Sequence, residues 1–276
     1  MNIAMRNNLA VDTTAINAAQ AAEAEACSGQ YDQNDKQCNH DYKVSCSRCR
    51  LSMICLPIAL QAPDIERLDA IVLRGRPLRK GEYVYREGQT FTSVYAVRAG
   101  TLKAYSTTDS GEEQVTGFYL PGEIFGMDGL GKNKHVSSAV ALETSAICEI
   151  PFERLSNLSS HIPSLQRHFF QLMSQEIAQD QQLIAQLGKN TAEQRIAALL
   201  LSISARNARR KLSVTHFRLP MSRTDIGNYL GLTVETVSRI FSRFQKIGLL
   251  TSDHREIELL HVDDLRAIAS GKAAFD

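Results

Sequence analysis

The chain has 276 residues, of which 43% are hydrophobic and 22% charged, and its formal net charge is +1. A chain of this length and hydrophobic content can bury real cores and is expected to form two domains. No run approaches about 18 apolar residues, so we expect no membrane span. The start of the chain lacks the basic and apolar regions of a signal peptide, which predicts a cytoplasmic protein.

The charge is unevenly spread along the chain. From Asn190 onwards there are 13 Lys or Arg against 9 Asp or Glu, a difference of +4. An excess of this size is compatible with contact to phosphates, but it is too small to demonstrate it.

The amino-terminal part contains a polar tail and then a cysteine-rich segment. Residues 1–26 are rich in Ala, Asn, Thr and Gln without an apolar period, which predicts a disordered tail. Residues 27–60 contain five of the six cysteines, and Cys46, Cys49 and Cys55 lie within ten positions. In a reducing cytoplasm, clustered cysteines are more often metal ligands or redox groups than disulfides.

Three thiolates this close together can surround one inorganic centre, and the spacing leaves two kinds of centre open. Zinc takes four nitrogen or sulfur ligands, whereas an iron–sulfur cluster takes thiolates, commonly with one distant in sequence. The run ends in Cys55-Leu-Pro57 and no second Cys-x-x-Cys or His pair follows, which favours iron–sulfur. Cys148, in the apolar run 146–151, could be the distant ligand or simply a packing cysteine.

Residues 61–162 are expected to form a domain of short β-strands. Alternating apolar runs separated by glycine turns are typical of a sandwich or jelly roll. The runs 94–98 and 101–105 alternate across a tight turn, which predicts a hairpin.

Residues 126–133 of this domain match a phosphate-binding loop except at their last position. Asn133 stands where a hydroxyl should hold magnesium. The following residues 136–140 predict a strand and not the helix that would meet a phosphate. We therefore reject a nucleotide phosphate site here.

Residues 163–188 are predicted to form one long helix. Its apolar residues recur at alternating steps of three and four, as in the seam of a two-stranded coiled coil, at Phe170, Met173, Ile177, Asp180, Ile184 and Leu187. This seam predicts a homodimer. The stripe is widened by Phe169, Leu172 and Leu183, so the helix could instead pack on its own domain. In a dimer Asp180 would face its own copy and repel it, unless the side chain turns to solvent.

Residues 189–276 are expected to form a winged helix-turn-helix. Ser222 can cap one short helix, Gly231 can make a tight turn, and Thr233 can cap a second helix. Two short helices joined by such a turn are typical of this motif, whose second helix enters the major groove of DNA. A hairpin, the wing, is predicted from the runs 249–251 and 256–260.

The exposed residues at the start of the second helix suit base edges, and they are Val234, Glu235, Ser238 and Arg239. Arginine can bond to guanine, glutamate can accept from cytosine, and valine can touch a thymine methyl. Nearby basic residues suit phosphates, where they add affinity but no sequence information, namely Arg223, Arg243 and Lys246. The alternative is an ordinary helical hairpin with a solvated charged face.

This order of jelly roll, long helix and winged helix-turn-helix resembles the cyclic-AMP receptor protein superfamily. Within it, the chain looks most like the fumarate and nitrate reductase regulator branch. The resemblance rests on the Cys-x2-Cys-x5-Cys-Leu-Pro run and on residues 117–122, 141–144, 148–152 and 225–239. It implies an α+β fold and a transcription regulator, and no catalytic constellation suggests an enzyme.

The resemblance also implies a cofactor and partners. A [4Fe-4S] cluster would be held by Cys46, Cys49, Cys55 and Cys148. The family's recognition positions fall on Glu235, Ser238 and Arg239, which implies double-stranded DNA with palindromic TTGAT-like half-sites. Contact with RNA polymerase is implied as well, and the loop 109–113 is a candidate surface. Oxygen would destroy the cluster and return monomers with weak affinity for DNA.

Two departures from the wider superfamily affect these expectations. Met127 and Ser137 stand where the cyclic-AMP branch has the Glu and Arg that bind ribose and cyclic phosphate, so we expect no cyclic nucleotide. Tyr42 stands where the family usually has a further cysteine, and whether Cys38 or Cys27 replaces a ligand stays open. The alternative function is a zinc-stabilised, redox-insensitive transcription factor of the same fold.

Overall fold

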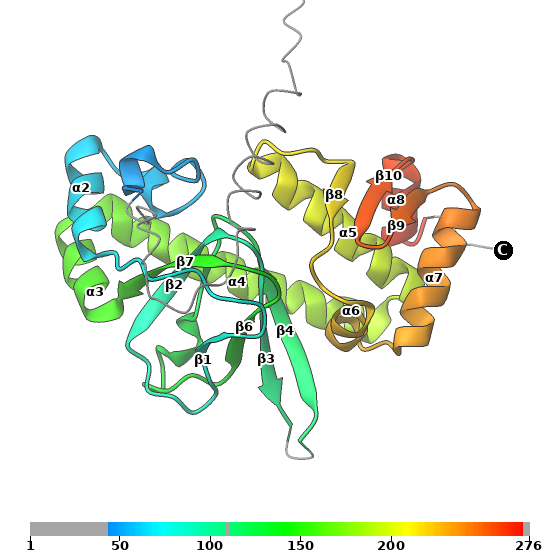
Figure 1. Cartoon of the computed structure of the whole chain (residues 1–276), viewed down its shortest axis with the longest axis horizontal. Helices are drawn as coiled ribbons and strands as arrows, with labels where there is room; N and C mark the ends of the chain where they lie inside the picture. The colour runs from blue at the N-terminus through cyan, green and yellow to red at the C-terminus, as the bar shows by residue number, and fades with distance from the viewer. Residues whose placement is uncertain (1–43, 109–110, 273–276) are drawn as a thin grey trace, which may run out of the picture. The chain divides into compact units, whose positions relative to one another are not determined.

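The computed structural model describes residues 44–108 and 111–272 of the chain (Figure 1). The predicted tail, Cys27, Cys38 and Tyr42 lie outside the described residues. Along the described part, a cysteine segment is followed by a β-rich domain, a long helix and a helical domain with a small sheet. The predicted order of jelly roll, long helix and winged helix-turn-helix is therefore confirmed.

The β-rich domain, here called the roll, consists of two antiparallel sheets with strand orders β1-β6-β3-β4 and β5-β2-β7. The first sheet comprises β1 (Tyr83–Tyr85), β6 (Ser138–Ala141), β3 (Leu102–Thr107) and β4 (Glu113–Tyr119). The second comprises β5 (Ile124–Phe125), β2 (Ser93–Ala99) and β7 (Ala146–Pro151). Side chains from both sheets meet between them, and Val97, Leu102 and Phe125 are at most 1% exposed.

The predicted hairpin between β2 and β3 is wrong. β2 pairs with β5 and β7, whereas β3 pairs with β4 and β6, so the two consecutive strands lie in different sheets. The chain changes sheet at Gly100, whose φ is +76° and where a Cβ would come within 2.3 Å of Ser145 Oγ. A left-handed glycine serves a sheet-to-sheet crossover as well as a hairpin, so the turn alone does not distinguish them.

Short helices cover one end of the roll, and a long helix runs beside it (Figure 1). They are η1 (Cys46–Arg48), η2 (Leu56–Ala59), α2 (Ala62–Ile71), η3 (Met127–Gly129), α3 (Phe152–His161) and α4 (Pro163–Lys189). The predicted long helix is thus observed, with α4 extending two residues past Leu187. Leu165 and Phe169 on α4 join a core with Leu56, Leu68 and Leu155.

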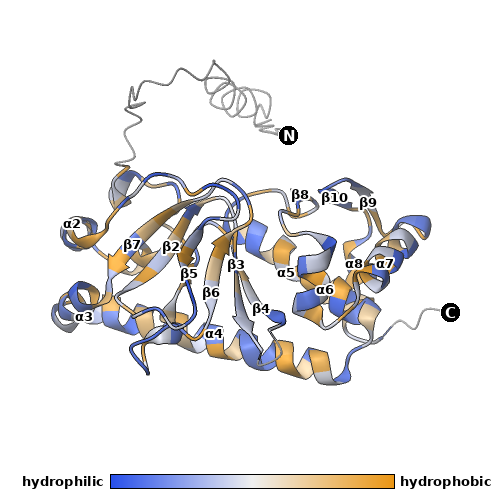
Figure 2. Ribbon diagram, turned by 60° about the horizontal axis from the view of Figure 1, so that its bottom comes forward, coloured by the Kyte–Doolittle hydropathy of each residue, from blue (hydrophilic) through white to orange (hydrophobic). Residues whose placement is uncertain are grey.

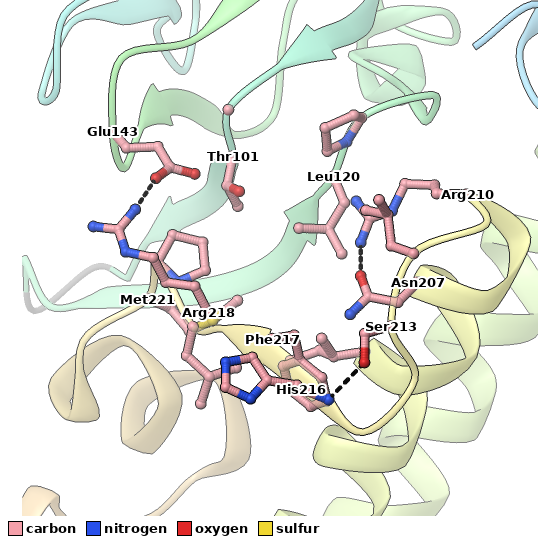
Figure 3. A pocket seen from close by; sticks show the side chains of 16 residues that line it. Thr101, Leu120, Glu143, Asn207, Arg210, Ser213, His216, Phe217, Arg218 and Met221 are labelled. Carbon is pink, nitrogen blue, oxygen red and sulfur yellow. Dashed lines mark hydrogen bonds and ion pairs between the residues drawn. The ribbon is translucent and has the colours of Figure 1, made fainter. Parts of the chain in front are cut away.

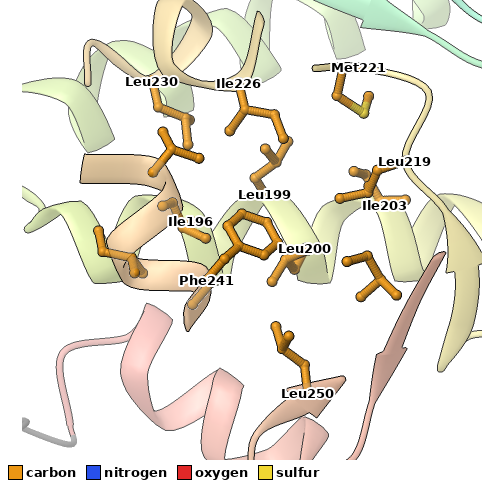
Figure 4. Packing of buried hydrophobic residues seen from close by; sticks show 14 of the residues in the cluster. Ile196, Leu199, Leu200, Ile203, Leu219, Met221, Ile226, Leu230, Phe241 and Leu250 are labelled. Carbon is orange, nitrogen blue, oxygen red and sulfur yellow. The ribbon is translucent and has the colours of Figure 1, made fainter. Parts of the chain in front are cut away.

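The carboxy-terminal domain, here called the reader, surrounds a single apolar core (Figure 4). Its elements are α5 (Ala192–Arg209), β8 (His216–Arg218), α6 (Arg223–Leu230), α7 (Val234–Lys246), β9 (Leu250–Asp253), β10 (Glu256–Leu259) and α8 (Val262–Ala269). Its sheet has the order β8-β10-β9, and β9 and β10 form the predicted wing hairpin. Ile196 and Leu200 of α5 and Phe244 of α7 are completely buried.

The reader and the roll share this core. Tyr105, Val115 and Phe118 of the roll belong to the same buried cluster as Ile226 and Leu230 of α6. Across the described part of the chain, no helix has both the length and the hydropathy that crossing a membrane requires.

Candidate metal centre and nucleic-acid interface

Cys46, Cys49 and Cys55 lie on a compact segment formed by η1, a turn and η2. Cys46 begins η1 and Cys55 directly precedes η2. The Cys55 N–H donates to the Leu51 carbonyl at 3.0 Å, and Leu51 is only 6% exposed. The segment therefore folds around its own buried leucine and brings the three cysteines onto two consecutive short helices and the turn between them.

Cys148 reaches the same region from the middle of β7, where it lies opposite Ala96 of β2. Leu73, just after α2, exchanges two backbone hydrogen bonds of 2.8 and 2.9 Å with Glu149. α2 also packs against η1. It thereby links the cysteine segment to the strand that carries Cys148.

The four thiols are close enough to influence one another. All four are half-buried and free. Negative charge on Cys148 raises the pKa of Cys46 and of Cys55. Negative charge on Cys49 raises the pKa of Cys55 and of Cys148. Burial raises the pKa of Cys46 and of Cys55 to about 12, so both are neutral thiols unless a cation stabilises the thiolate.

The donor set fits a sulfur-ligated centre. Across residues 44–108 and 111–272, the His, Cys, Asp and Glu side chains as they stand form no group of three or more that could hold a metal ion. Four sulfur donors, with no nitrogen or oxygen donor among them, are nevertheless what an iron–sulfur cluster or a four-cysteine zinc site requires.

Two charged residues hold Cys46 beside this centre, and sequence analysis missed both. Asp69 of α2 accepts the Cys46 N–H at 2.7 Å and a hydrogen bond from Arg74 at 2.5 Å. Arg74 Nη2 also lies 3.3 Å from Cys46 Sγ. Burial tends to raise the pKa of Asp69, but these hydrogen bonds outweigh burial and hold that pKa below its usual value. No motif marks this pair, because the fold alone brings the two residues to Cys46.

The cysteine segment contacts both α4 and the roll. Leu56, next to Cys55, is 1% exposed in the core that includes Leu165 and Phe169 of α4. Ile54 lies against Gly122, where a Cβ would come within 2.5 Å of its Cδ1. A displacement of the segment would therefore disturb the packing at the start of α4.

The seam predicted on α4 is divided between two environments. Phe170, Ile177 and Ile184 are 55%, 58% and 68% exposed, whereas Met173 and Leu187 are partly buried. The residues that widen the stripe pack on the chain itself, namely Phe169, Leu172 and Leu183. Hydrophobic residues recur along the whole of α4 (Figure 2). One face thus packs internally, and another presents an apolar row to solvent.

Asp180 lies on the exposed part of this helix, and partial burial raises its pKa. One turn earlier, Glu176 accepts a hydrogen bond from the Tyr119 hydroxyl at 2.7 Å. Burial, reinforced by the charge of Asp180, raises the pKa of Glu176 to about 7. Two acidic residues thus lie one turn apart on the helix that carries the apolar row.

The carboxylate of Asp128 lies against Ser137, the position at which the cyclic-AMP branch has its phosphate-binding arginine. Asp128 accepts hydrogen bonds from the backbone N–H groups of Val136 and Ser137, both at 3.0 Å, and from the Ser137 hydroxyl at 2.8 Å. It also bonds to the buried His135 ring at 2.9 Å. The strand predicted after Asn133 is observed as β6. These amides already have an anionic partner supplied by the chain.

The reader presents the predicted helix-turn-helix. Ser222 caps α6 in a capping box with Asp225, Gly231 ends the helix with φ +63°, and Thr233 caps α7. Val237 and Phe241 anchor α7 in the core. The residues predicted to read bases lie on its exposed side, namely Val234, Glu235, Ser238 and Arg239.

The basic residues predicted to contact phosphates differ in their surroundings. Arg223 lies 3.4 Å from the centre of the Phe241 ring and bonds to Ser252 of the wing at 3.2 Å. Burial lowers its pKa to about 10. Arg243 lies 3.6 Å from Glu193, and Lys246 is exposed. Arg223 therefore also ties α6 to α7 and the wing.

Polar contacts fix α6 on the edge of β4. The Asn228 side chain accepts from the Val115 N–H and donates to the Glu113 carbonyl. Gln114 Nε2 donates to the Asn228 carbonyl at 2.7 Å. Lys103 of β3 forms an ion pair of 2.9 Å with Asp225. The side-chain amide of Asn228 thus pairs with β4 as a neighbouring strand would.

A cavity of about 340 Å³ lies beside this contact between roll and reader (Figure 3). Its polar groups are largely engaged, since Arg218 pairs with Glu143 at 2.6 Å and Arg210 bonds to Asn207. Leu120 and Phe217 contribute to its apolar wall.

A roll joined by a long helix to a winged helix-turn-helix defines a class of DNA-binding transcription regulators. Residues 75–161 match the family described as cyclic nucleotide-binding domain, and residues 194–268 match the Crp-like helix-turn-helix domain. The transcriptional activator protein anr of Pseudomonas aeruginosa is 52% identical over 230 residues, covering 83% of this chain and 94% of that protein.

Two further relatives agree. The fumarate and nitrate reduction regulatory protein of Escherichia coli (strain K12) is 45% identical over 226 residues, covering 82% of this chain and 90% of that protein. The structure of FixK2 from Bradyrhizobium japonicum has a TM-score of 0.66 and 30% identity, covering 75% of this chain and all of that one. The chain belongs to the Crp/FNR family, in its fumarate and nitrate reductase regulator branch, and is a transcription regulator and not an enzyme.

Proposed function

We propose that this chain is an oxygen-responsive transcription regulator that binds DNA as a dimer while it carries a [4Fe-4S] cluster on Cys46, Cys49, Cys55 and Cys148. The observation that carries the proposal is that α2 packs on the segment with Cys46, Cys49 and Cys55 and, through Leu73, is hydrogen-bonded to the strand that carries Cys148, so that four half-buried cysteines from two distant parts of the sequence converge. When bound, such a cluster supplies an oxygen-sensitive link between its four ligands.

The chain's own residues would convert that link into a change at the dimer helix. Cys148 would anchor one side of the centre to β7, which pairs with β2, while Cys55 leads directly into the buried Leu56. Leu56 shares a core with Leu165 and Phe169 of α4. Holding Cys55 close to Cys148 would fix Leu56 and the start of α4, whereas releasing it would loosen that packing.

Dimerisation would use the apolar row on α4, with Phe170, Ile177 and Ile184 as its exposed members. Three large apolar side chains recurring along one helix suit a second copy of the same helix. Asp180 would then approach its own copy, and its repulsion would oppose the dimer until the bound cluster fixes the start of α4. We expect Asp180→Ala to give dimers in air, and monomers of this variant would contradict the repulsion.

The reader would bind a palindromic operator with TTGAT-like half-sites. Two recognition helices in a dimer reach successive major grooves about 34–36 Å apart. On α7, Ser238 and Arg239 follow Glu235 by three and four positions, so the three side chains lie on one face of the helix. They would face the same base edges, with Val234 beside them. Arg223, Arg243 and Lys246 would contact phosphates.

RNA polymerase would be contacted through the loop 109–113, of which residues 109 and 110 lie outside the described part. Cyclic nucleotides would not bind, which is supported by the Asp128 carboxylate on the amides of Val136 and Ser137. The functional division would be 1–26, 27–60, 61–162, 163–188 and 189–276, in a cytoplasmic protein.

The first experiment is to purify the full chain without oxygen and measure iron, sulfide and zinc content, visible absorption and sedimentation before and after air. We expect a brown dimer that bleaches to a monomer and loses affinity for a palindromic TTGAT-type duplex. Cys148→Ala should be colourless and monomeric, whereas Cys27→Ala and Cys38→Ala should behave as the parent chain. Loss of colour in Cys38→Ala would revise the ligand set.

A colourless, zinc-containing dimer that is indifferent to air would contradict the oxygen response. It would instead support a zinc-stabilised regulator, for which four cysteine ligands are equally suitable.

A further inference from the structure

Arg74 is a buried guanidinium beside two of the four thiols. Its side chain is 11% exposed. One nitrogen, Nη2, lies 2.5 Å from Asp69 Oδ1 and 3.3 Å from Cys46 Sγ, and its charge also stabilises the thiolate of Cys148. A single side chain thus bonds to Cys46 and lies within electrostatic range of Cys148, two cysteines from distant parts of the sequence.

The donors of Arg74 are incompletely used. Nη1 makes a long 3.5 Å contact with the Val72 carbonyl, and Nε is buried without a hydrogen-bond partner among the described residues. A buried donor without an acceptor is destabilising, so such groups in native proteins usually have a partner. An acceptor beside the thiols would satisfy Arg74 Nε, and the sulfur atoms of an iron–sulfur cluster could serve as such an acceptor.

Asp69 makes the placement of Arg74 specific. It accepts from both Arg74 and the Cys46 backbone, so guanidinium and ligand are held by the same carboxylate. Leu73, adjacent to Arg74, is tied to Glu149 beside Cys148. The two charged residues therefore connect α2 to both sides of the centre.

We propose that Arg74, held by Asp69, is a positioning residue of the cluster site that donates hydrogen bonds to the sulfur atoms of the bound cluster and its ligands. The inference rests on the proposed function. Four thiolates give an iron–sulfur centre a net negative charge, which a buried guanidinium offsets. Arg98 is a second cation that stabilises the Cys148 thiolate, but only Arg74 is placed by Asp69 and bonded to Cys46.

The test compares Arg74→Gln and Arg74→Lys with Arg76→Gln in the full chain. Arg76 is a matched control, since it lies two positions away, is 66% exposed and pairs with Glu82 on the surface. Asp69→Asn keeps the size of the side chain and tests the same anchor if Arg74→Gln folds poorly.

Two measurements address the cluster. The half-life of the visible absorption in air should fall about tenfold or more in Arg74→Gln, the effect typical of losing a partner of metal ligands. Iron–sulfur stretching bands in resonance Raman spectra should move to higher frequency, because a lost hydrogen bond no longer weakens those bonds. Arg74→Lys should fall between, since it keeps the charge without the fork of donors.

A third measurement needs no cluster. In the air-exposed chain, alkylation of Cys46 followed by mass spectrometry should be several-fold faster in Asp69→Asn than in the parent or Arg76→Gln, because the Cys46 N–H loses its charged acceptor. Unchanged labelling would overturn the anchoring of Cys46.

The outcomes separate the two proposals. If the parent chain binds a cluster and Arg74→Gln shows the Raman bands and lifetime of Arg76→Gln, the inference is overturned while the proposed function stands. Equal loss of lifetime in Arg76→Gln would also overturn it, as a general destabilisation. If the parent chain binds no cluster, hydrogen bonding to the cluster is refuted together with the proposed function.

Discussion

The thiol site and the recognition helix are assembled in opposite ways. Cys46 and Cys148 are about a hundred positions apart, and the site exists only because α2 and β7 bring them together. The helix-turn-helix is built from contacts between near neighbours, such as the Ser222 and Thr233 caps, whose partners lie three residues away. One site depends on the whole roll, whereas the caps and the turn of the other lie within about 25 consecutive residues.

The difference is also visible in how their polar groups are satisfied. The caps of α6 and α7 have their hydrogen-bond partners within the chain, and the recognition face is exposed without further rearrangement. At the thiol site Arg74 Nε is buried without a partner in the described residues, and Cys46 and Cys55 have strongly raised pKa values. The caps of the helix-turn-helix are thus satisfied within the motif, whereas the thiol site retains a buried donor without a partner among the described residues.

The sharpest test of this contrast is Leu56→Ala. This substitution removes buried packing next to Cys55 and leaves the four cysteines unchanged. Leu56 is 1% exposed in a core shared with α4, so the cavity should lower the free energy of unfolding by about 2–5 kcal/mol. Urea denaturation of the air-exposed chain measures this loss. Ile58→Ala, at a 50% exposed position of the same segment, should change it by less than about 0.5 kcal/mol. Equal effects would show that η2 does not anchor the segment.

The sequence predicts the locally determined features correctly, whereas it does not predict the features that depend on distant residues. The caps, the turn at Gly231, the wing and the long helix were predictable because their signals lie within a few residues. The pairing of β2 and β3 was predicted wrongly, because sheet membership depends on distant partners such as Ile147 and Ala139. Arg74 gave no signal, since its role follows from a contact 28 positions away.

Asn228→Ala tests whether the reader acts as a unit of its own or through the roll. The variant leaves the Val115 N–H and the Glu113 carbonyl of β4 without their side-chain partner, at a cost of about 1–3 kcal/mol. In calorimetry we expect the parent chain to unfold in one transition, because the two domains share a core, and Asn228→Ala to unfold in two. Thr224→Ala, at an exposed position of the same helix, should retain one transition. A single transition in both variants would assign the coupling to the shared apolar core.

Arg239→Ala tests the local site directly. Loss of one bidentate contact to a base should weaken binding to the preferred duplex by about 1–3 kcal/mol and relax specificity at one position. Arg243→Ala should instead weaken binding to all duplexes similarly and reduce the salt dependence by about one ion. Fluorescence anisotropy with single-base operator variants distinguishes the two patterns. Uniform weakening by Arg239→Ala would make it a phosphate contact.

The smallest expected effect is a pH dependence of the free energy of unfolding. It is caused by Glu176 on α4, the helix that lies between the roll and the reader in the sequence. Burial raises the pKa of Glu176 to about 7 from an ordinary value of 4.5, so the folded chain binds this proton more tightly than the unfolded chain. The stabilisation is fully present below pH 4.5 and is lost as the pH rises through about 7. Tyr119 donates to Glu176, while Asp180, Glu123 and Asp128 add negative charge around it.

Glu176→Gln should flatten this part of the pH profile in the air-exposed chain, because the amide mimics the protonated acid and still accepts the Tyr119 hydroxyl. Its melting temperature should exceed that of the parent at pH 8 and match it near pH 5. Gln175→Glu adds a carboxylate at the neighbouring exposed position and should leave the profile between pH 5 and 8 unchanged. If the parent and Glu176→Gln respond identically to pH, then Glu176 is ionised at neutral pH and the acidic pair on α4 carries a larger repulsion into the dimer.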